Sequence, residues 1–437
     1  MLTYGCEVWG YSAQKIHIRR KLLSAQRQAL IAITKAYRTA PTNALQVIAG
    51  LTPIHLQILQ RYVNNLIIKY QAKELSTTQL HNIINRLNLP NDIQNLIRDV
   101  DDYGIDINNS NELTHPSETT TMIIHDIQDG PPKGKNFYTD GSKTANSVGA
   151  AVYFTDTLTP SHWQAVARLR DHCSIKQAES LAILRALQHI NDHPQRFQHG
   201  KVNIISDSRI ALLKILKHLR DNNIQIYFHW VKGNSDTNGN DQADDLARKA
   251  ANITSKIHYQ ALPLTAVLSS LRSIIINKWQ NEWDNSTTGR YRYAFIPNIN
   301  QRLNNHVCHT NCESSQGYGV TLTGTSQAFW ISHNHGLAQM LTAHENFRTY
   351  LNRFHNKGNA KCNCGIPEDE DPIHITFTCP NYNSQRRPFR NKADSEGLLW
   401  PCQLKDLVNN NKLFKAFKTF ISNTKLSIYS NVASNTN

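Results

Sequence analysis

Four acidic side chains in the middle of the chain lie where apolar segments begin or end. Asp140 follows the β-prone run 136–139, and Asp207 ends a second β-branched run. Glu179 and Asp244 lie near the starts of two stretches whose apolar residues recur at helical spacing. Carboxylates that meet at one point repel each other, and divalent cations neutralise that repulsion. Because two hard cations about 4 Å apart can hold the attacking and leaving oxygens of a phosphodiester, the set predicts metal-dependent phosphodiester chemistry.

The segment around these acids alternates between strand and helix signals. Any one acid alone is typical of a helix cap, a turn or a surface charge, so the prediction depends on the ordered set. Parallel pairing is needed to bring the ends of separated strands together, which predicts an α/β domain with a mixed five-stranded sheet and flanking helices. We expect strands at 136–140, 148–154, 163–169, 202–205 and 224–231, and helices from Gln177, with Leu181, Leu184, Leu187 and Ile190 buried, from Arg209 and from Asp241.

Residues 134–252 resemble a type 1 ribonuclease H domain. The matching pieces arrive in order: Thr139-Asp140-Gly141-Ser142, Ala178-Glu179, Ser206-Asp207-Ser208, and Gly239-Asn240 followed by Ala243-Asp244-x-Leu246-Ala247. The resemblance implies a hybrid-specific endoribonuclease that cuts the RNA strand of an RNA–DNA hybrid and leaves a 5′-phosphate and a 3′-hydroxyl. It also implies that Asp140, Glu179, Asp207 and Asp244 bind two Mg²⁺ ions, with Mn²⁺ as a substitute. Asp140 and Asp207 would touch both ions, and Glu179 and Asp244 would each hold one.

Two features of this domain concern turnover and substrate binding. The family often carries a His in a loop before the last acid, where this chain has Asn234. Asn cannot move a proton near neutral pH, so we expect weakened activity that Asn234→His would raise. Ser142, Gln177 and Arg209 flank the acids and are candidate contacts to the substrate backbone or its 2′-hydroxyls. Roles as caps or solvated side chains are the alternative for these three.

The composition favours a polyanionic partner. The chain has 437 residues, with 47 Lys and Arg against 33 Asp and Glu, a formal charge of +14. Such a surplus is typical of nucleic-acid binding, and a merely soluble basic protein is the alternative. No apolar run is long enough to span a membrane, and no secretory signal precedes the first helix. We therefore expect an intracellular protein, nuclear or cytoplasmic, whose eight cysteines are reduced and, where clustered, bind metal.

Residues 1–72 read as helical and resemble the segment after the polymerase palm of non-LTR, LINE-like retrotransposon reverse transcriptases. The likeness lies in Leu2-Thr-Tyr-Gly-Cys-Glu-Val-Trp9 and in the run from Gln26 to Ile54. The aromatic-x-Asp-Asp motif of a palm does not occur in the sequence, so we expect no polymerase activity. The resemblance implies the C-terminal part of a longer polyprotein or a truncated reading frame.

The remaining regions are less regular. Residues 73–133 are rich in polar residues and predict a partly ordered linker with one short helix before Pro90. Residues 253–355 predict a helical region that starts with a helix from 266 to 283. The alternating run Arg290-Tyr291-Arg292-Tyr293 fits either base stacking or an edge strand.

Residues 356–437 contain a second motif, Cys362-x-Cys364-x₉-His374-x₄-Cys379. Two close thiols, then an imidazole and a thiol about one helical turn apart, can close a tetrahedron around a structural Zn²⁺. The motif resembles the C-terminal Cys-Cys-His-Cys segment of non-LTR retrotransposon reading frames, and free reduced cysteines are the alternative. Cys308 and Cys312, with two histidines nearby, form a weaker candidate for a second metal.

Two functions remain open from the sequence. The first is the hybrid-specific nuclease, which the four intact carboxylates favour. The second is a nucleic-acid-binding protein with weak or no catalysis, a retroelement remnant that uses its basic surface and zinc segment. Asn234 and the missing palm favour the second.

Overall fold

The chain forms two compact units in the computed structural model. One unit is Leu66–Leu271, and the other combines Met1–Asn65 with Arg272–Asn437. The structure describes residues 3–71, 74–87, 89–106, 124–126, 132–197, 201–208, 226–231, 238–254, 256–304, 335–344 and 346–424. Among the helices of these ranges, none is long and apolar enough to cross a membrane.

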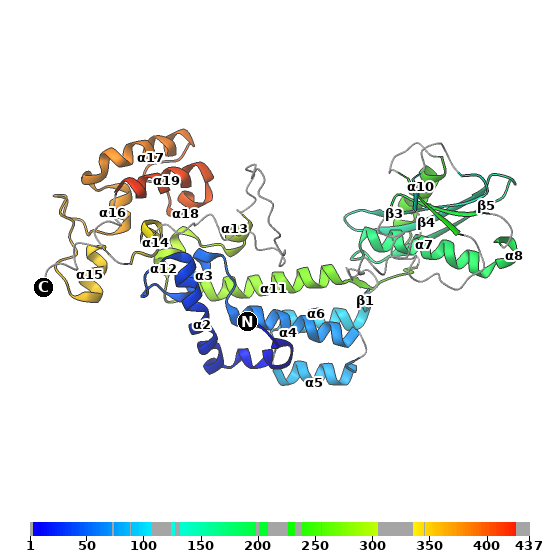
Figure 1. The fold of residues 1–437 in the computed structure, drawn as a ribbon, viewed down its shortest axis with the longest axis horizontal. Helices are drawn as coiled ribbons and strands as arrows, with labels where there is room; N and C mark the ends of the chain where they lie inside the picture. The colour runs from blue at the N-terminus through cyan, green and yellow to red at the C-terminus, as the bar shows by residue number, and fades with distance from the viewer. Residues whose placement is uncertain are drawn as a thin grey trace. The chain divides into compact units, whose positions relative to one another are not determined.

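The unit Leu66–Leu271 is built on a mixed sheet (Figure 1). Its strands lie in the order β2-β7-β6-β3-β4-β5, with β3, β4 and β5 antiparallel and β2, β7, β6 and β3 parallel. The five expected strands are adjacent in this order, and β2 adds a sixth at the edge. The strands are β2 (Ile124–Asp126), β3 (Lys135–Lys143), β4 (Val148–Asp156), β5 (His162–Leu169), β6 (Val202–Ser206) and β7 (Ile226–Trp230).

The first strand is longer than expected. We placed its end at Asp140, but β3 continues to Lys143 because its last residues pair with the start of β4, as far as the Lys143–Val148 pair. Asp140 is therefore inside an antiparallel ladder on one side. On the other side the parallel ladder to β6 ends one residue earlier, at Thr139.

Two helices cover opposite faces of the sheet. Phe137 packs in one cluster with Ile183 of α7 (Ile175–Asp192), whereas Tyr138 packs with Ala243 of α10 (Asn238–Ala251). Neighbouring residues of a strand point to opposite faces, so α7 and α10 lie on different sides of β3. On α7, Leu187 and Ile190 are buried as expected, but Leu184 is 43% exposed. The small side chains of Ala178, Ala182 and Ala186 face the sheet instead.

Residues outside the predicted nuclease domain complete this unit. The expected short helix is α5 (Thr77–Leu87), and a second helix that we did not expect follows as α6 (Asn91–Tyr103). After α6, β1 (Ile105–Asp106) pairs in parallel with β8 (Leu262–Pro263). Part of the expected linker is thus regular structure.

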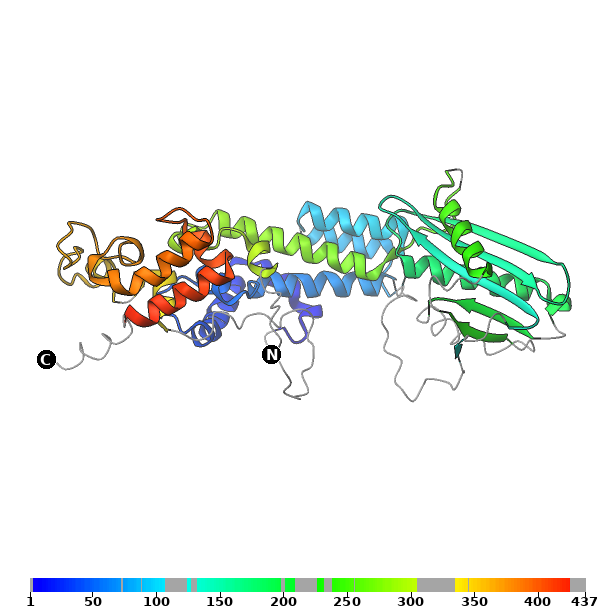
Figure 2. The ribbon, with the colours of Figure 1, turned by 90° about the horizontal axis from the view of Figure 1, so that it is seen from above.

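The other unit is helical, and it combines an N-terminal with a C-terminal segment of the chain (Figure 2). Arg302 donates from Nη2 to the carbonyl of Ile48 at 2.8 Å and from Nε to that of Val47 at 3.1 Å. These bonds tie Arg302 to carbonyls in the last turn of α3. The N-terminal elements, helical as predicted, are α1 (Cys6–Trp9), η1 (Gly10–Gln14), α2 (Ile16–Thr34), α3 (Thr42–Ala49) and α4 (Ile54–Gln71).

The C-terminal part continues with further helices. The expected helix 266–283 is α11, and the run 290–293 is not an edge strand. It starts α12, in which Arg292 is fully buried. The elements are α11 (Leu264–Asp284), α12 (Arg290–Phe295), α13 (Ile299–Asn304), α14 (His335–Thr342), α15 (Arg348–His355), α16 (Pro372–Phe377), η3 (Pro380–Tyr382), α17 (Asn383–Ser395), α18 (Leu404–Asn409) and α19 (Asn411–Thr424).

Candidate active site and metal centre

Two of the four predicted acids lie at the same level of neighbouring strands. The last pair of the parallel ladder between β3 and β6 is Thr139 with Ser206, so Asp140 and Asp207 are the next residue on each strand. Two residues earlier on the same strands, Tyr138 and Ile205 share a cluster under α10. Because side chains alternate along a strand, both acids belong to the face that α10 covers.

Glu179 comes from α7, on the opposite face. A Cβ on Gly141 would lie 2.8 Å from the amide nitrogen of Glu179 and 2.9 Å from Cβ of Ala178. Only glycine leaves room for the first turn of α7 at this point of β3, next to Asp140. The hydroxyl of Ser208 donates to Oε2 of Glu179 at 2.5 Å, which ties the helix to the end of β6.

Asp244 is held by close packing of α10 on the sheet. A Cβ on Gly149 would lie 2.3 Å from the carbonyl oxygen of Ala247, and one on Gly239 would lie 2.3 Å from the ring of Tyr138. Both glycines therefore let α10 approach β3 and β4. Asp244 forms an ion pair with Arg248, one turn further along the helix.

The four carboxylates act on one another electrostatically. Burial and the charges of Asp207, Asp244 and Glu179 together raise the pKa of Asp140 to about 7, against a hydrogen bond from the Gly141 amide that lowers it. Burial is also the main cause that raises the pKa of Glu179 and of Asp207, and Asp207 adds to the shift of Glu179. Mutual effects of this kind require that acids from β3, α7, β6 and α10 lie near one another.

The donor set fits a hard divalent cation. Oδ1 of Asp207 is buried and has no hydrogen-bond partner among the described residues. Carboxylates with raised pKa values and an unsatisfied oxygen are stabilised when a cation takes the place of their protons, and oxygen ligands suit Mg²⁺ and Mn²⁺. The residues that would hold it are Asp140, Glu179, Asp207 and Asp244.

The three predicted substrate contacts have different outcomes in the structure. Gln177 is 2% exposed, so it does not face a substrate. It is the third residue of the capping box of α7, where its Oε1 accepts from the amide of Ser174 at 2.8 Å. Ser142 is half-buried on β3 and stays a candidate. Arg209 and Asn234 lie outside the described residues.

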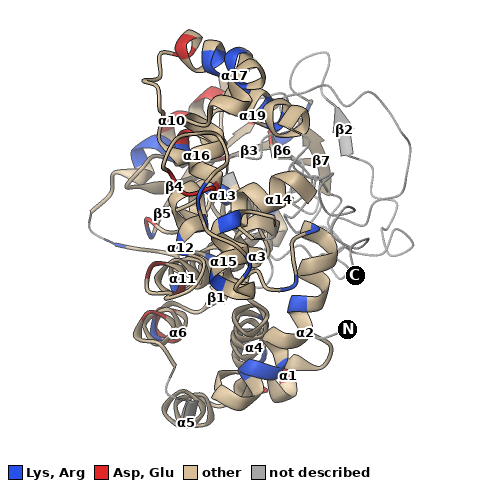
Figure 3. Cartoon of the chain, turned by 90° about the vertical axis from the view of Figure 1, so that its left-hand side faces the viewer, with Lys and Arg blue, Asp and Glu red and all other residues tan. Residues whose placement is uncertain are grey.

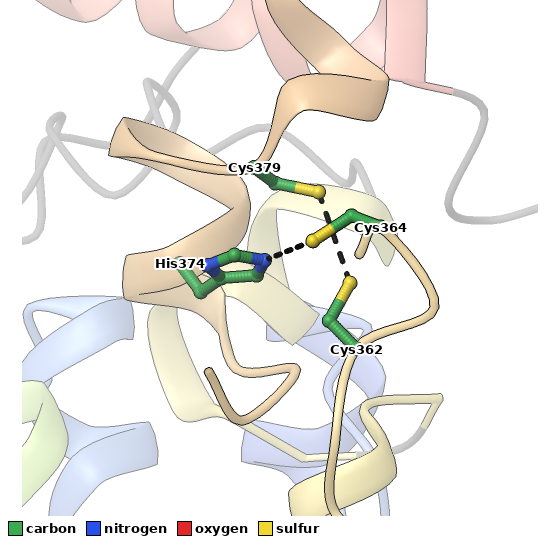
Figure 4. A group of neighbouring side chains, drawn as sticks. All are labelled: Cys362, Cys364, His374 and Cys379. Carbon is green, nitrogen blue, oxygen red and sulfur yellow. Dashed lines mark hydrogen bonds between the residues drawn. The ribbon is translucent and has the colours of Figure 1, made fainter. Parts of the chain in front are cut away.

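The Cys-His motif forms one compact cluster (Figure 4). Its four ligand atoms lie within 4.8 Å of one another, with Cys362 Sγ 3.8 Å from Cys379 Sγ and Cys364 Sγ 3.3 Å from Nε2 of His374. A tetrahedron with Zn–S bonds of about 2.3 Å has S–S edges of about 3.8 Å, so these positions fit zinc. All three thiols are free, and the sulfur separation excludes a disulfide.

Local structure orients the ligands of this cluster. The helix α16 starts at Pro372 and is capped by the side chain of Asp371. The Nε2 atom of His374 points at the thiols because Oε2 of Glu368 lies 2.6 Å from Nδ1 on the other side of the ring. A carboxylate on the second ring nitrogen is the usual support of a zinc-bound histidine. Arg386 donates to the carbonyls of Ile375, Thr376 and Cys379 and so fixes the end of α16.

The surroundings shift the pKa values of the Cys362 and Cys364 thiols in opposite directions. Burial raises the pKa of the Cys362 thiol to about 12. At Cys364, hydrogen bonds from the Ile366 amide and the neighbouring ligands outweigh burial and lower the pKa to about 7. Zinc requires thiolates, and Cys364 is the thiol that ionises first. Cys308 and Cys312 lie outside the described residues.

Several supporting residues escaped the sequence interpretation. Ser208 directly follows Asp207, and its bond to Glu179 has no signature beyond that proximity. The capping box of Ser174 and Gln177 is readable as a Ser-x-x-Gln pattern. Glu368 lies in the acidic turn of the zinc motif, but the sequence does not say which of its acids meets His374.

Comparison with known proteins adds little to this geometry. No family model matches the chain, and no curated protein matches it. A crystal structure of LC11-RNase H1 in complex with an RNA/DNA hybrid matches 27% of this chain and 96% of its own length, at 18% identity and a TM-score of 0.22. That score is too low to carry an argument. The α/β assignment therefore rests on the strand order and on the helices that cover each face.

Proposed function

We propose that the chain is a metal-dependent endoribonuclease that cleaves the RNA strand of RNA–DNA hybrids. The observation that carries the proposal is the placement of Asp140, Glu179, Asp207 and Asp244 on four different elements, with the charges of the other three acids raising the pKa of Asp140. A structural role would not gather four acids at a point where burial disfavours their charge.

The residues divide the work in the following way. Divalent cations, when bound, neutralise the carboxylates and supply the Lewis-acid chemistry of phosphodiester hydrolysis. Asp140 and Asp207 form the rigid base of the site because each follows the last residue of the parallel ladder between β3 and β6. Glu179 is held by Ser208, whose hydroxyl keeps the carboxylate turned toward the end of β6. Asp244 enters from α10 and is balanced by Arg248.

The second candidate is a nucleic-acid-binding protein with weak or no catalysis. It is favoured by the formal charge of +14 and by Asn234 in the position where the resembling family often has His. The C-terminal region contributes basic residues to such a role, since α17 alone carries Arg386, Arg387, Arg390 and Lys392 (Figure 3). Arg386 is buried, so it supports the fold and not the surface.

The biological setting is part of the proposal. An origin in a LINE-like retrotransposon polyprotein rests on the sequence resemblances of residues 1–72, 134–252 and 356–437. In that setting the nuclease would remove template RNA, and the zinc segment would help to hold nucleic acid. An intracellular location, nuclear or cytoplasmic, agrees with the six free cysteines among the described residues.

The test is cleavage of a hybrid labelled on its RNA strand by the full chain with Mg²⁺. Asp244→Asn is compared with Asp245→Asn, because the two acids are neighbours on α10 and Asp245 forms a surface ion pair with Lys249. We expect Asp140→Asn and Asp244→Asn to lower the rate about a thousand-fold, or about 4 kcal/mol of barrier, and Asp245→Asn to leave it unchanged. Binding without cutting, with a steep salt dependence, would favour the second candidate.

A further inference from the structure

A buried polar network lies at the start of α7, outside the four acids. Asp106 of β1 is 8% exposed, and its Oδ2 accepts from Nε2 of Gln177 at 3.1 Å. The same Nε2 donates to the carbonyl of Ala261 at 3.0 Å. Tyr259 bonds to Asp106 with its hydroxyl and also contacts Gln177. Three polar side chains from three separate segments therefore meet where the helix begins.

The backbone around this network is tied to the nuclease core. Residues 258–263 run beside the end of β5. The amide of Arg170 donates to the carbonyl of Tyr259 at 2.9 Å, and the amide of His258 donates to the carbonyl of Arg168 at 2.7 Å. The amide of Leu262 donates to the carbonyl of Gly104 at 2.8 Å, which brings the residues after α6 to the same place. We name residues 104–106 and 258–263 the clamp.

The position of the clamp on α7 gives it a consequence for the site. Gln177 is the third residue of α7 and completes the capping box with Ser174, and Glu179 follows two residues later, where the second turn begins. Asp106 binds the side-chain carboxamide of Gln177. It therefore fixes the rotation and height of the start of α7, and with them the position of Glu179. Because Gly141 packs closely against this part of α7, a small shift of the helix would produce a steric clash.

We propose that Asp106, with Tyr259, is a positioning residue for the acidic site, acting on Glu179 through Gln177. This inference rests on the proposed function, and it extends the working unit beyond residues 134–252. Asp106 does not touch substrate or metal. It reduces the freedom of the first turn of α7, so that the carboxylate of Glu179 is in place before a cation binds. Supporting residues of this kind typically change metal affinity about 10- to 100-fold.

The experiment compares Asp106→Leu, Asp106→Asn and Asp102→Leu in the full chain. Asp102 is the matched control, because it is an exposed acid near the end of α6. We expect Asp106→Leu to raise the Mg²⁺ concentration for half-maximal cleavage about 10-fold and to speed amide hydrogen exchange in the first turn of α7, with KM for the hybrid unchanged. Asn keeps an oxygen acceptor, so Asp106→Asn is expected to stay close to the wild type.

A merely structural role would give a different result. It would lower the fraction of folded protein and leave the Mg²⁺ dependence of the folded fraction unchanged, which would overturn the proposal. An effect of Asp102→Leu equal to that of Asp106→Leu would do the same. If Asp106→Leu does not fold, Tyr259→Phe removes one donor to Asp106 and keeps the ring, and we expect it to shift the Mg²⁺ dependence in the same direction by a smaller factor.

The positioning role can be tested even if the proposed nuclease function is wrong. If the wild-type chain does not cleave the hybrid, the positioning role is still tested by the thermal shift on adding Mn²⁺ and by hydrogen exchange in α7. Loss of the Mn²⁺ shift in Asp106→Leu, with the shift retained in Asp102→Leu, supports positioning without any cleavage. Equal Mn²⁺ shifts and equal exchange in the two variants contradict it.

Discussion

Asp140 and Asp207 each lie one residue beyond the last pair, Thr139 and Ser206, of the parallel ladder between β3 and β6. Parallel strands end at the same edge of a sheet, so the register alone puts the two acids side by side. Glu179 and Asp244 reach this edge from helices on opposite faces, and their positions depend on how closely those helices approach the strands.

Gly141→Ala tests the approach of α7 to β3. The new methyl group would lie 2.8 Å from the amide nitrogen of Glu179, and the helix must move to accept it. We expect a loss of stability of about 1–3 kcal/mol from overpacking, measured by urea unfolding, and a larger relative loss of cleavage. Ser180→Ala is the control on the same helix, since the hydroxyl of Ser180 has no hydrogen-bond partner in the part of the chain that the structure describes. Normal cleavage in Gly141→Ala would contradict the tight contact.

Ser208→Ala tests the support of Glu179. The hydroxyl of Ser208 lowers the pKa of Glu179, against the burial that raises it. Without it, the pKa of Glu179 rises, and the acid limb of the pH–rate profile should move to higher pH. Loss of a hydrogen bond to a charged group costs about 1.5–3 kcal/mol. This corresponds to a loss of about 10- to 100-fold in the cleavage rate on the acid side of the profile. Ser208→Thr keeps the hydroxyl, and an equal shift in both variants would rule out this role.

Cys362→Ser tests the zinc cluster. Each wild-type chain is expected to retain one Zn²⁺ in elemental analysis, and the variant to lose it together with thermal stability, because the site holds a short segment in place. Cys402→Ser is the control, as Cys402 is buried in the same unit but lies outside the cluster. Full zinc content in Cys362→Ser would show that the cluster is not a metal site.

Glu368→Gln tests the support of His374. Its Oε2 lies 2.6 Å from Nδ1 of His374, and weakening this contact should lower zinc affinity about 10-fold in a competition with a chelator. Asp369→Asn is the matched control, because Asp369 pairs with Lys361 at the surface. Equal affinities in the two variants would count against an orienting role for Glu368.

His189→Phe tests the pH dependence of stability. The ring of His189 stacks on Trp163 with centroids 3.7 Å apart, and burial, then the charges of His193 and Arg196, lower its pKa to about 4. The unfolded chain takes up the proton near pH 6.5, so the stability due to neutral His189 is present above pH 6.5 and is lost as the pH falls toward 4. Phe keeps the stack and cannot be protonated.

The measurement is urea unfolding at pH 7 and pH 5. The difference in free energy of unfolding between these two values should be smaller in His189→Phe than in the wild type. The exposed His162 serves as the control, and His162→Gln should behave like the wild type. An unchanged difference in His189→Phe would show that His189 is not the group responsible.

Much of the nuclease unit was predictable because its signals are local. Five strands, the presence of α7 and the order of the four acids follow from alternation, helical spacing and short motifs. The end of β3 was misplaced because Asp140-Gly141 resembles a turn, whereas pairing with β4 carries the strand on. Leu184 was wrongly placed inside because the helix uses its alanines to approach the sheet.

By itself, the sequence determined the candidate residues for the proposed chemistry, since ligand types and their order along the chain are local properties: four separated acids, and a Cys-x-Cys, His, Cys set. Only the tertiary structure decided what supports them. Asp106 meets Gln177, Glu368 meets His374, and Gln177 serves a cap and not a substrate. Contacts between segments far apart in sequence have no local signature, because they depend on how whole elements pack.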